Sequence, residues 1–186
     1  MKLIKQLCTS VFIAAIAVSA VIAGEQPVAI DVVNNANIKN FVAHNNLVFS
    51  AAQPTDEQFK QLSQAKVKHV INLRAADEQD WDEGALVNSL GMSYHAIEIA
   101  GAQDINIDNA KRLASLLEEL KGESVVVHCA SSNRVGALMA ISAHQQGADI
   151  ESAIETGKQW GMASLEPVVR KAVSYTHLTL PTKRIV

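Results

Sequence analysis

Hydrophobic residues gather in four short runs along this chain, and longer segments of mixed polarity separate them. The runs are rich in Val, Ile and Leu and lack helical periodicity, which predicts buried β-strands. The predicted strands cover residues 47–50, 67–73, 93–99 and 124–128. The last run, Val125-Val126-Val127, is apolar throughout, as expected for a strand that is covered on both faces.

The segments between and after these runs place apolar residues three and four positions apart, as one face of a helix requires. Thr55 and Gln58 have the spacing of a capping box at a helix start, and Gly91 and Gly122 stand where helices would end. The predicted helices cover residues 55–65, 77–90, 106–120, 133–146, 149–160 and 164–172. Alternating strands and helices favour a single α/β domain, with a mostly parallel central sheet of about four strands flanked by helices. Residues 25–40 are weakly patterned, and we expect a loose arm there.

The first 23 residues have the features of a secretory signal peptide. Lys2 and Lys5 precede an apolar run at residues 11–23, and polar residues follow it. Cleavage is expected after Ala23, with Ala20 as the second choice. A membrane anchor is the alternative, but the run is short for a bilayer span. We therefore expect an exported, periplasmic protein that has no membrane attachment after cleavage.

The other end of the chain also differs from the middle. The string from Val173 to Val186 breaks the preceding helical pattern and resembles the in-frame translation of a transposon-type sequencing adaptor. We expect this tail to be non-native and to carry no fold or function. Residues 24–172 then form one domain by length.

The charge of that domain limits its partners. Four of the 16 basic residues lie in the two end segments, which leaves 12 basic residues against 19 acidic ones and a net charge of −7. The four are Lys2, Lys5, Lys183 and Arg184. An acidic domain of this kind is not expected to bind nucleic acid or an anionic membrane surface.

A thiol, a short polar loop and an arginine follow the last predicted strand. Cys129 ends the sequence Val125-Val126-Val127-His128-Cys129, and four residues, Ala130-Ser131-Ser132-Asn133, separate it from Arg134. In a parallel sheet this places Cys129 at the carboxyl edge, where ligands bind, and opposite the start of a helix. The N–H groups of the loop and of the helix start form an anion site there, and their positive field activates a thiol. Arg134 has the geometry to bind two oxygens of a phosphate.

Cys129 is the only cysteine in residues 24–172, whereas exported proteins usually pair their cysteines or avoid them. A buried, inert cysteine is the alternative interpretation. The polar loop and Arg134 favour a reactive and accessible nucleophile. Two chemistries use such a thiol: a cysteine-dependent phosphatase, and a sulfurtransferase that carries a persulfide. A non-catalytic module that binds phosphate or a phosphorylated protein is the third possibility.

The loop resembles the signature of the protein tyrosine and dual-specificity phosphatases, with His128-Cys129 and Arg134 in the family's positions. The rest of the domain resembles a bacterial subgroup of small dual-specificity-like phosphatases, often encoded beside or fused to β-lactamase-like hydrolases. Three segments carry this resemblance: Ser50-Ala51-Ala52-Gln53-Pro54-Thr55, Val70-Ile71-Asn72-Leu73-Arg74 and Gly91-Met92-Ser93-Tyr94.

The resemblance implies a protein tyrosine phosphatase-like fold and hydrolysis of phosphomonoesters without a metal or another cofactor. Cys129 would be the nucleophile, Arg134 would bind the phosphoryl oxygens, and His128 would support the loop. The backbone from Ala130 to Asn133 would complete the phosphate site. Asp104 would be the general acid, with Glu98 in reserve.

This loop departs from the family pattern in three ways. It has four residues between Cys129 and Arg134 where the family has five, it has Ser131-Ser132 where the family usually has a glycine, and it has Val135 where a hydroxyl usually follows the arginine. The shorter loop matches the length found in rhodanese-type sulfurtransferases, so phosphate and sulfur chemistry both stay open. Ser131 or Ser132 could supply the missing hydroxyl.

Other polar residues of the chain have simpler interpretations. Arg74 could extend the anion site, but an ion pair with Asp77 or Glu78 is the preferred interpretation. The acidic residues between positions 77 and 83 are expected to form a solvated helix face, since neither a histidine nor a regular ligand spacing accompanies them. The scattered histidines show no zinc pattern.

Overall fold

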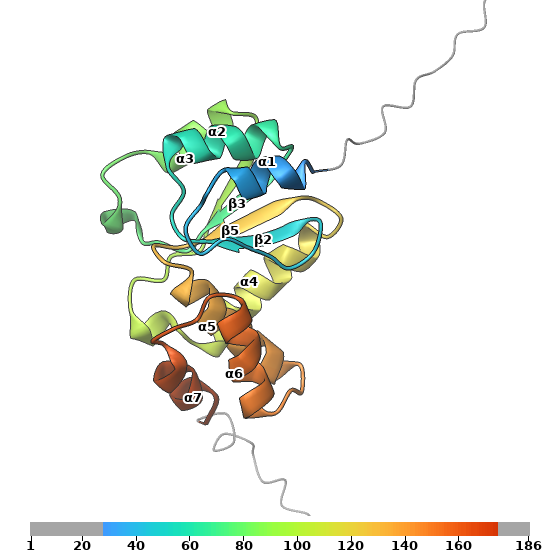
Figure 1. Cartoon of the computed structure of the whole chain (residues 1–186). Helices are drawn as coiled ribbons and strands as arrows, with labels where there is room; N and C mark the ends of the chain where they lie inside the picture. The colour runs from blue at the N-terminus through green and yellow to red at the C-terminus, as the bar shows by residue number, and fades with distance from the viewer. Residues whose placement is uncertain (1–27, 175–186) are drawn as a thin grey trace, which may run out of the picture.

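A five-stranded sheet in the order β1-β2-β5-β3-β4 forms the centre of the computed structural model, which describes residues 28–174 (Figure 1). Within it, β2, β5, β3 and β4 run parallel, and β1 runs antiparallel to β2. The strands are β1 (Val42–Ala43), β2 (Val48–Ala51), β3 (His69–Asn72), β4 (Ser93–Ala96) and β5 (Val125–His128). The predicted α/β class and the four predicted strands are confirmed. β1 was not predicted, because two residues are too few to show an alternating pattern.

Helices of residues 28–174 cover both faces of the sheet (Figure 1), with three on one face and four on the other. The first face carries α1 (Ile30–Asn35), α2 (Asp56–Gln64) and α3 (Glu83–Ser89). The second carries α4 (Ile107–Glu119), α5 (Asn133–Gln145), α6 (Ile150–Gln159) and α7 (Glu166–Ser174). Two short 3₁₀ turns, η1 (Ala76–Glu78) and η2 (Ala102–Asp104), lie in the loops after β3 and β4.

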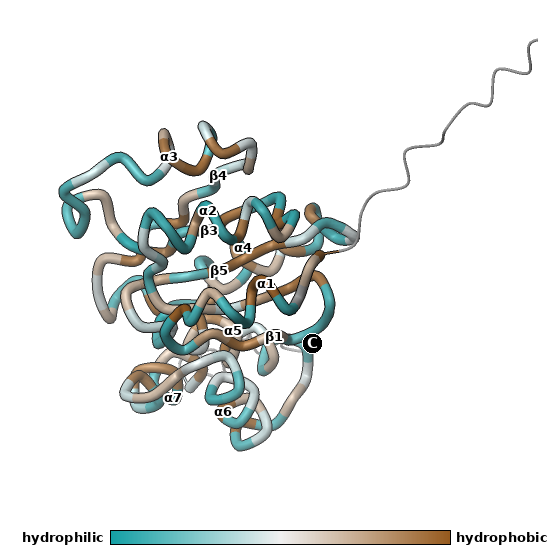
Figure 2. Tube along the Cα trace, turned by 45° about the horizontal axis from the view of Figure 1, so that its top comes forward, coloured by the Kyte–Doolittle hydropathy of each residue, from teal (hydrophilic) through white to brown (hydrophobic). Residues whose placement is uncertain are grey.

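The central strand β5 is buried on both faces, as its apolar sequence predicts. Val126 packs with Phe49 and Phe59 under α1–α3, whereas Val125 and Val127 pack with the cluster under α4–α7. The hydrophobic residues therefore form one layer on each side of the sheet. Hydrophobic and hydrophilic stretches alternate along the helices that cover it (Figure 2). This burial fixes the position of the strand that leads into Cys129.

Two sequence predictions about local structure are wrong. The helix expected over residues 77–90 begins only after Asp82, whose side chain accepts a hydrogen bond from the backbone N–H of Ala85. The residues before it form η1 and an irregular loop, because Glu78 is held by contacts with the residues around Cys129 described below. The expected loose arm instead contains α1, which buries Val33 against α2 and the sheet.

The predicted segments at the two ends lie largely outside the described residues. The signal peptide predicted for residues 1–23 is wholly outside them. At the other end α7 continues through Ser174 and buries Val173, two residues past the predicted domain boundary. The rest of the predicted adaptor-like tail, residues 175–186, is not described.

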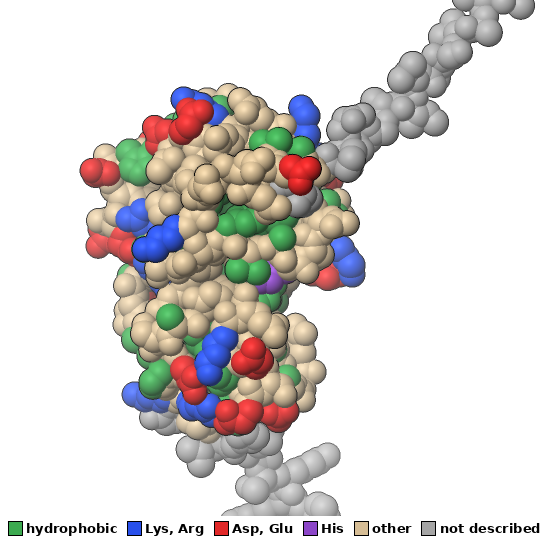
Figure 3. Space-filling model, viewed as in Figure 1, with side chains coloured by type: hydrophobic (Ala, Val, Ile, Leu, Met, Phe, Trp, Pro, Cys, Tyr) green, Lys and Arg blue, Asp and Glu red, His purple; other side chains and the backbone are tan. Residues whose placement is uncertain are grey.

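The surface of residues 28–174 carries charged side chains of both signs. They are interspersed in the view of Figure 3, including the end of the molecule where α6 and α7 lie. Arg170 of α7, for example, pairs with Glu151 and Glu166 there. No helix among these residues has the length and apolar character that crossing a bilayer requires.

A stacked ring pair joins the start of the sheet to the end of α6. The rings of His44 and Trp160 lie 3.5 Å apart between centroids with an interplanar angle of 7°. His44 Nε2 also lies 2.8 Å from the hydroxyl of Ser50, which is fully buried. Burial lowers the pKa of His44 from 6.5 to about 4. The folded protein therefore favours neutral His44.

We predict that this stack makes the stability of the fold pH-dependent. The unfolded chain takes up a proton on His44 below pH 6.5, whereas the folded chain does so only near pH 4. Stability should be complete above pH 6.5 and fall as the pH drops toward 4. In thermal melts across this range, His44→Phe should show a shallower fall than the wild type, because it keeps the stacking and cannot titrate. If the melting temperatures of the two proteins fall equally with pH, protonation of His44 does not affect the stability of the fold.

Candidate active site

Cys129 lies at the carboxyl end of β5, directly before the loop that leads into α5. Its thiol is free, as predicted, but only 1% of the residue is exposed. The expectation of an accessible thiol is therefore wrong for this conformation. The residue belongs to the hydrophobic cluster under α4–α7, beneath the loop.

The N-terminus of α5 differs from those of four other helices. In α2, α3, α4 and α6 a side chain of the N-cap residue accepts a hydrogen bond from a backbone N–H of the first turn. The N-cap of α5 is Ser132, and among the described residues it makes no such bond. The first N–H groups of a helix have no acceptor within the helix. Those of α5 are therefore left for an anion at the loop.

Ser132 has a left-handed backbone conformation, with φ 68° and ψ −8°. This is the conformation that glycine adopts most readily, so a serine here is under backbone strain. Ser132 is fully buried, and its hydroxyl donates to the carbonyl of Trp160 at 3.0 Å. That hydroxyl is consequently committed to the fold in this structure. Gly161 makes room for it, since a Cβ there would lie 2.6 Å from the Ser132 Cβ.

Further contacts fix the remaining loop residues. The Asn133 side chain donates to the Ser164 hydroxyl at 2.8 Å and accepts from the Ala163 N–H at 2.8 Å. The Asn40 side chain donates to the Ser131 carbonyl at 2.9 Å. Ala130 and Ser131 are exposed. The loop is thus held from behind, while part of its outer surface faces solvent.

Arg134 is fixed by two acceptors on one side of its guanidinium. Nη1 donates to Glu78 Oε1 at 2.5 Å and to the Ile99 carbonyl at 2.6 Å, and Nη2 donates to Glu78 Oε2 at 2.6 Å. These three bonds leave the Nε–H and the second Nη2 hydrogen, which form a fork on one edge of the group. The hydrogen bond to Glu78 and the nearby Cys129 sulfur raise the pKa of Arg134. A cationic fork therefore lies next to the thiol.

Glu78 was not predicted to belong to this site. The hydrogen bond with Arg134 lowers its pKa to about 2, which favours the ionised carboxylate at neutral pH. The preferred interpretation of Arg74, an ion pair with Asp77 or Glu78, is confirmed for Glu78, with 3.7 Å between Arg74 Nε and Glu78 Oε2. The prediction that this acidic segment forms a solvated helix face is wrong for Glu78. It is also wrong for Glu83, which is only 1% exposed. Acidic residues on a loop gave no periodic signal that could have shown this.

His128 lies on the opposite face of β5 from Cys129 and is fully buried. Its Nε2 is 2.8 Å from Glu83 Oε1, at the start of α3. Its Nδ1 has no hydrogen-bond partner among the described residues. Glu83 Oε2 also accepts from the Gln53 side chain at 2.5 Å. The described side-chain hydrogen bond of His128 thus goes to α3 and not to the loop, and its predicted role as support for the loop stays a prediction.

Asp104, the predicted general acid, lies at the end of η2. Its Oδ2 accepts hydrogen bonds from the backbone N–H groups of Ala100 at 2.9 Å and Gly101 at 3.1 Å. In this conformation the Asp104 carboxylate therefore binds the backbone at the start of the loop that contains Asp104 itself. Glu98, the reserve candidate, is exposed. The role of Asp104 stays a prediction.

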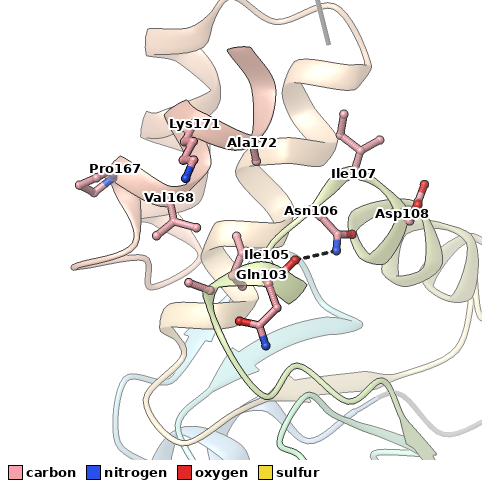
Figure 4. A pocket seen from close by; sticks show the side chains of 10 residues that line it. Gln103, Ile105, Asn106, Ile107, Asp108, Pro167, Val168, Lys171 and Ala172 are labelled. Atoms are coloured by element: carbon pink, nitrogen blue, oxygen red, sulfur yellow. Dashed lines mark hydrogen bonds between the residues drawn. The ribbon is translucent and has the colours of Figure 1, made fainter. Parts of the chain in front are cut away.

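A groove of about 790 Å³ lies between the segment 102–108, which contains Asp104, and helix α7. Figure 4 shows Gln103 and Ile105 on one side of it and Val168 and Lys171 on the other. Cys129 does not line this groove. Among residues 28–174, no group of three or more His, Cys, Asp or Glu side chains is arranged to hold a metal ion.

Comparison with solved structures finds the same fold in several proteins. A DUF442 protein from Shewanella putrefaciens CN-32, provisionally assigned as a phosphatase, is 23% identical, with a TM-score of 0.58 over 79% of this chain and 98% of that one. A protein from Neisseria meningitidis Z2491 with the same provisional assignment is 16% identical, with a TM-score of 0.57 over 74% and 98%. Kinase-associated phosphatase, with its catalytic-site cysteine replaced by serine, is 11% identical, with a TM-score of 0.54 over 78% and 91%.

At these identities the likeness shows the fold, and the predicted protein tyrosine phosphatase-like architecture is confirmed. No protein-family model matches the chain, and comparison with curated proteins finds no match in sequence. The role of each site residue therefore depends on the geometry described above.

The contact between Ser132 and Gly161 generates a stability prediction. Gly161→Ala should destabilise the protein by about 1–3 kcal/mol, because the added methyl group overlaps the loop and the backbone is left-handed. Gly147→Ala is the matched control, since φ is +101° there and no atom lies within 4 Å of the added Cβ. Chemical denaturation should show the larger loss for Gly161→Ala. Equal losses would mean that the loop does not press on Gly161.

Proposed function

We propose that this protein is an exported, cysteine-dependent phosphatase that hydrolyses phosphomonoesters through a phosphocysteine on Cys129. One observation carries the proposal: the thiol lies at the end of a buried strand, between the uncapped start of α5 and the open fork of Arg134. Backbone N–H groups and a guanidinium fork are the ligands that a phosphoryl group requires. Kinase-associated phosphatase has the same fold and a catalytic-site cysteine, and this likeness supports the proposal.

The proposed reaction has two steps. The Cys129 thiolate attacks phosphorus, the P–O ester bond breaks, and the leaving oxygen takes a proton from Asp104. Water then attacks phosphorus, the new P–O bond forms as the P–S bond breaks, and one proton of the water passes to the Asp104 carboxylate. Phosphate and the Cys129 thiolate are released. Arg134 and the N–H groups from Ala130 to Arg134 bind the phosphoryl oxygens while charge develops on them.

The short loop limits the expected rate. Four residues between Cys129 and Arg134 provide one N–H donor fewer than the family's five. Loss of one oxyanion donor can cost about 10²–10³-fold in rate. In addition, the residue that follows Arg134 is Val135, which has no hydroxyl to help the thiolate leave. We therefore expect weak hydrolysis with a slow second step, in which the phosphocysteine accumulates.

Trapping that intermediate tests the proposal. Wild-type protein quenched during turnover of a chromogenic aryl phosphate should carry one phosphoryl group on Cys129 by mass spectrometry. Cys129→Ser should show neither the adduct nor turnover, and its thermal melt should match the wild type. Sulfur transfer from thiosulfate through a Cys129 persulfide, without phosphate release, would establish the sulfurtransferase instead. Phosphate binding without either reaction would establish a binding module.

A second prediction concerns Asp104. If it protonates the leaving oxygen, Asp104→Asn should slow alkyl phosphates by about 10²–10⁴-fold and activated aryl phosphates much less, because activated leaving groups need no proton. Phosphate release from matched alkyl and aryl substrates measures the ratio. Its carboxylate also closes the η2 turn, so a melt of the variant is the control. An equal slowing of both substrates would assign Asp104 to structure.

A further inference from the structure

A continuous series of polar contacts joins the two residues that flank the loop. On one side His128 binds Glu83 at 2.8 Å, and Glu83 binds Gln53 at 2.5 Å. On the other side Arg134 binds Glu78 through two nitrogens. Both series end at Arg74, whose Nη1 donates to Gln53 Oε1 at 2.7 Å and whose Nη2 donates to the Glu78 carbonyl.

The position of Arg74 in the fold explains how it reaches both sides. It follows β3, which lies between β5 and β4 in the sheet. Gln53 comes from the segment after β2, and Glu78 comes from η1 in the green loop of Figure 1. The Arg74 side chain is only 16% exposed. Arg74 thus hydrogen-bonds both Gln53 and Glu78.

We infer that Arg74 is a positioning residue that holds His128 and Arg134 in register, and so sets the shape of the anion site around Cys129. This inference rests on the proposed function only in assigning phosphate as the anion. Arg74 orients the carboxylate of Glu78 by binding the loop that carries it. Glu78 in turn occupies one side of the Arg134 guanidinium and leaves the Nε fork for the ligand.

The geometry needs an arginine at this position. Its planar group reaches the Gln53 amide oxygen and the Glu78 carbonyl with two different nitrogens. A lysine ammonium is a single point charge on a flexible stem and lacks that fork. Arg74→Lys should therefore keep the charge and still lose most of the positioning effect.

The experiment measures the affinity for inorganic phosphate and the alkylation rate of Cys129 by iodoacetamide at neutral pH. Arg74→Gln should weaken phosphate binding by about tenfold or more and slow alkylation several-fold, as loss of a supporting contact around a binding group commonly does. Arg74→Lys should resemble Arg74→Gln. Arg170→Gln is the control, because it removes an equally well-paired arginine on α7 and should change neither quantity.

A double variant separates positioning from general destabilisation. If Arg74 acts through Glu78, the two substitutions should not add. The double variant Arg74→Gln/Glu78→Gln should then bind phosphate with an affinity no lower than that of the single variant with the lower affinity. Gln53→Met removes the hydrogen bonds of Gln53 to Arg74 and Glu83. It replaces Arg74→Gln in the experiment if that variant does not fold, and it should also slow the alkylation of Cys129. Wild-type values in folded Arg74→Gln or Gln53→Met, or full rescue by lysine, would overturn the inference.

The outcomes distinguish this inference from the proposed function. Normal phosphate affinity and alkylation in Arg74→Gln, together with phosphatase turnover in the wild type, would reject the inference alone. Slowed alkylation in Arg74→Gln, with no phosphoester hydrolysis by the wild type, would reject the phosphatase and keep Arg74 as a positioning residue. A wild-type thiol that binds no phosphate and reacts no faster than free cysteine would reject both.

Discussion

The uncapped start of α5 is the feature on which the rest of the site depends. Four other helices of the domain satisfy their first turn with an N-cap side chain. At α5 the equivalent hydroxyl, that of Ser132, turns away and donates to Trp160. The helix dipole and the first-turn N–H groups, which have no acceptor within the helix, are thereby directed at the loop that begins with Cys129. A left-handed serine is costly, and its burial against Gly161 and α6 maintains it.

Close packing of α5 on α6 keeps that helix start in place. Gly136, on the first turn of α5, lies against α6 so tightly that a Cβ would be 2.4 Å from the Gly157 carbonyl. Gly157 faces Gly136 and Ala140 in the same way. Because the two backbones meet without side chains between them, α5 has little freedom to shift along α6. The loop, the thiol and the helix start are therefore held as one unit against the second face of the sheet.

The sequence predicted those parts of the structure that local patterns encode. The strand run ending at His128, the capping box at Thr55 and the place of Cys129 before a helix were all found. The supporting contacts were not, because Glu78, Glu83 and Gln53 come from three separate loops or helix starts and meet only through the fold. An acidic segment looks the same in sequence whether it is solvated or paired with a buried arginine. The burial of Cys129 also depends on tertiary packing, which no spacing reveals.

Backbone amide shifts on addition of inorganic phosphate test the central claim most directly. In ¹⁵N-resolved NMR spectra of the wild-type protein, the account predicts the largest shifts at the amides of residues 130–135, with smaller shifts at the starts of the capped helices. Arg134→Ala should weaken the response at the same amides. Saturable shifts centred elsewhere on the molecule, or none at the start of α5 at high phosphate concentration, would contradict the account.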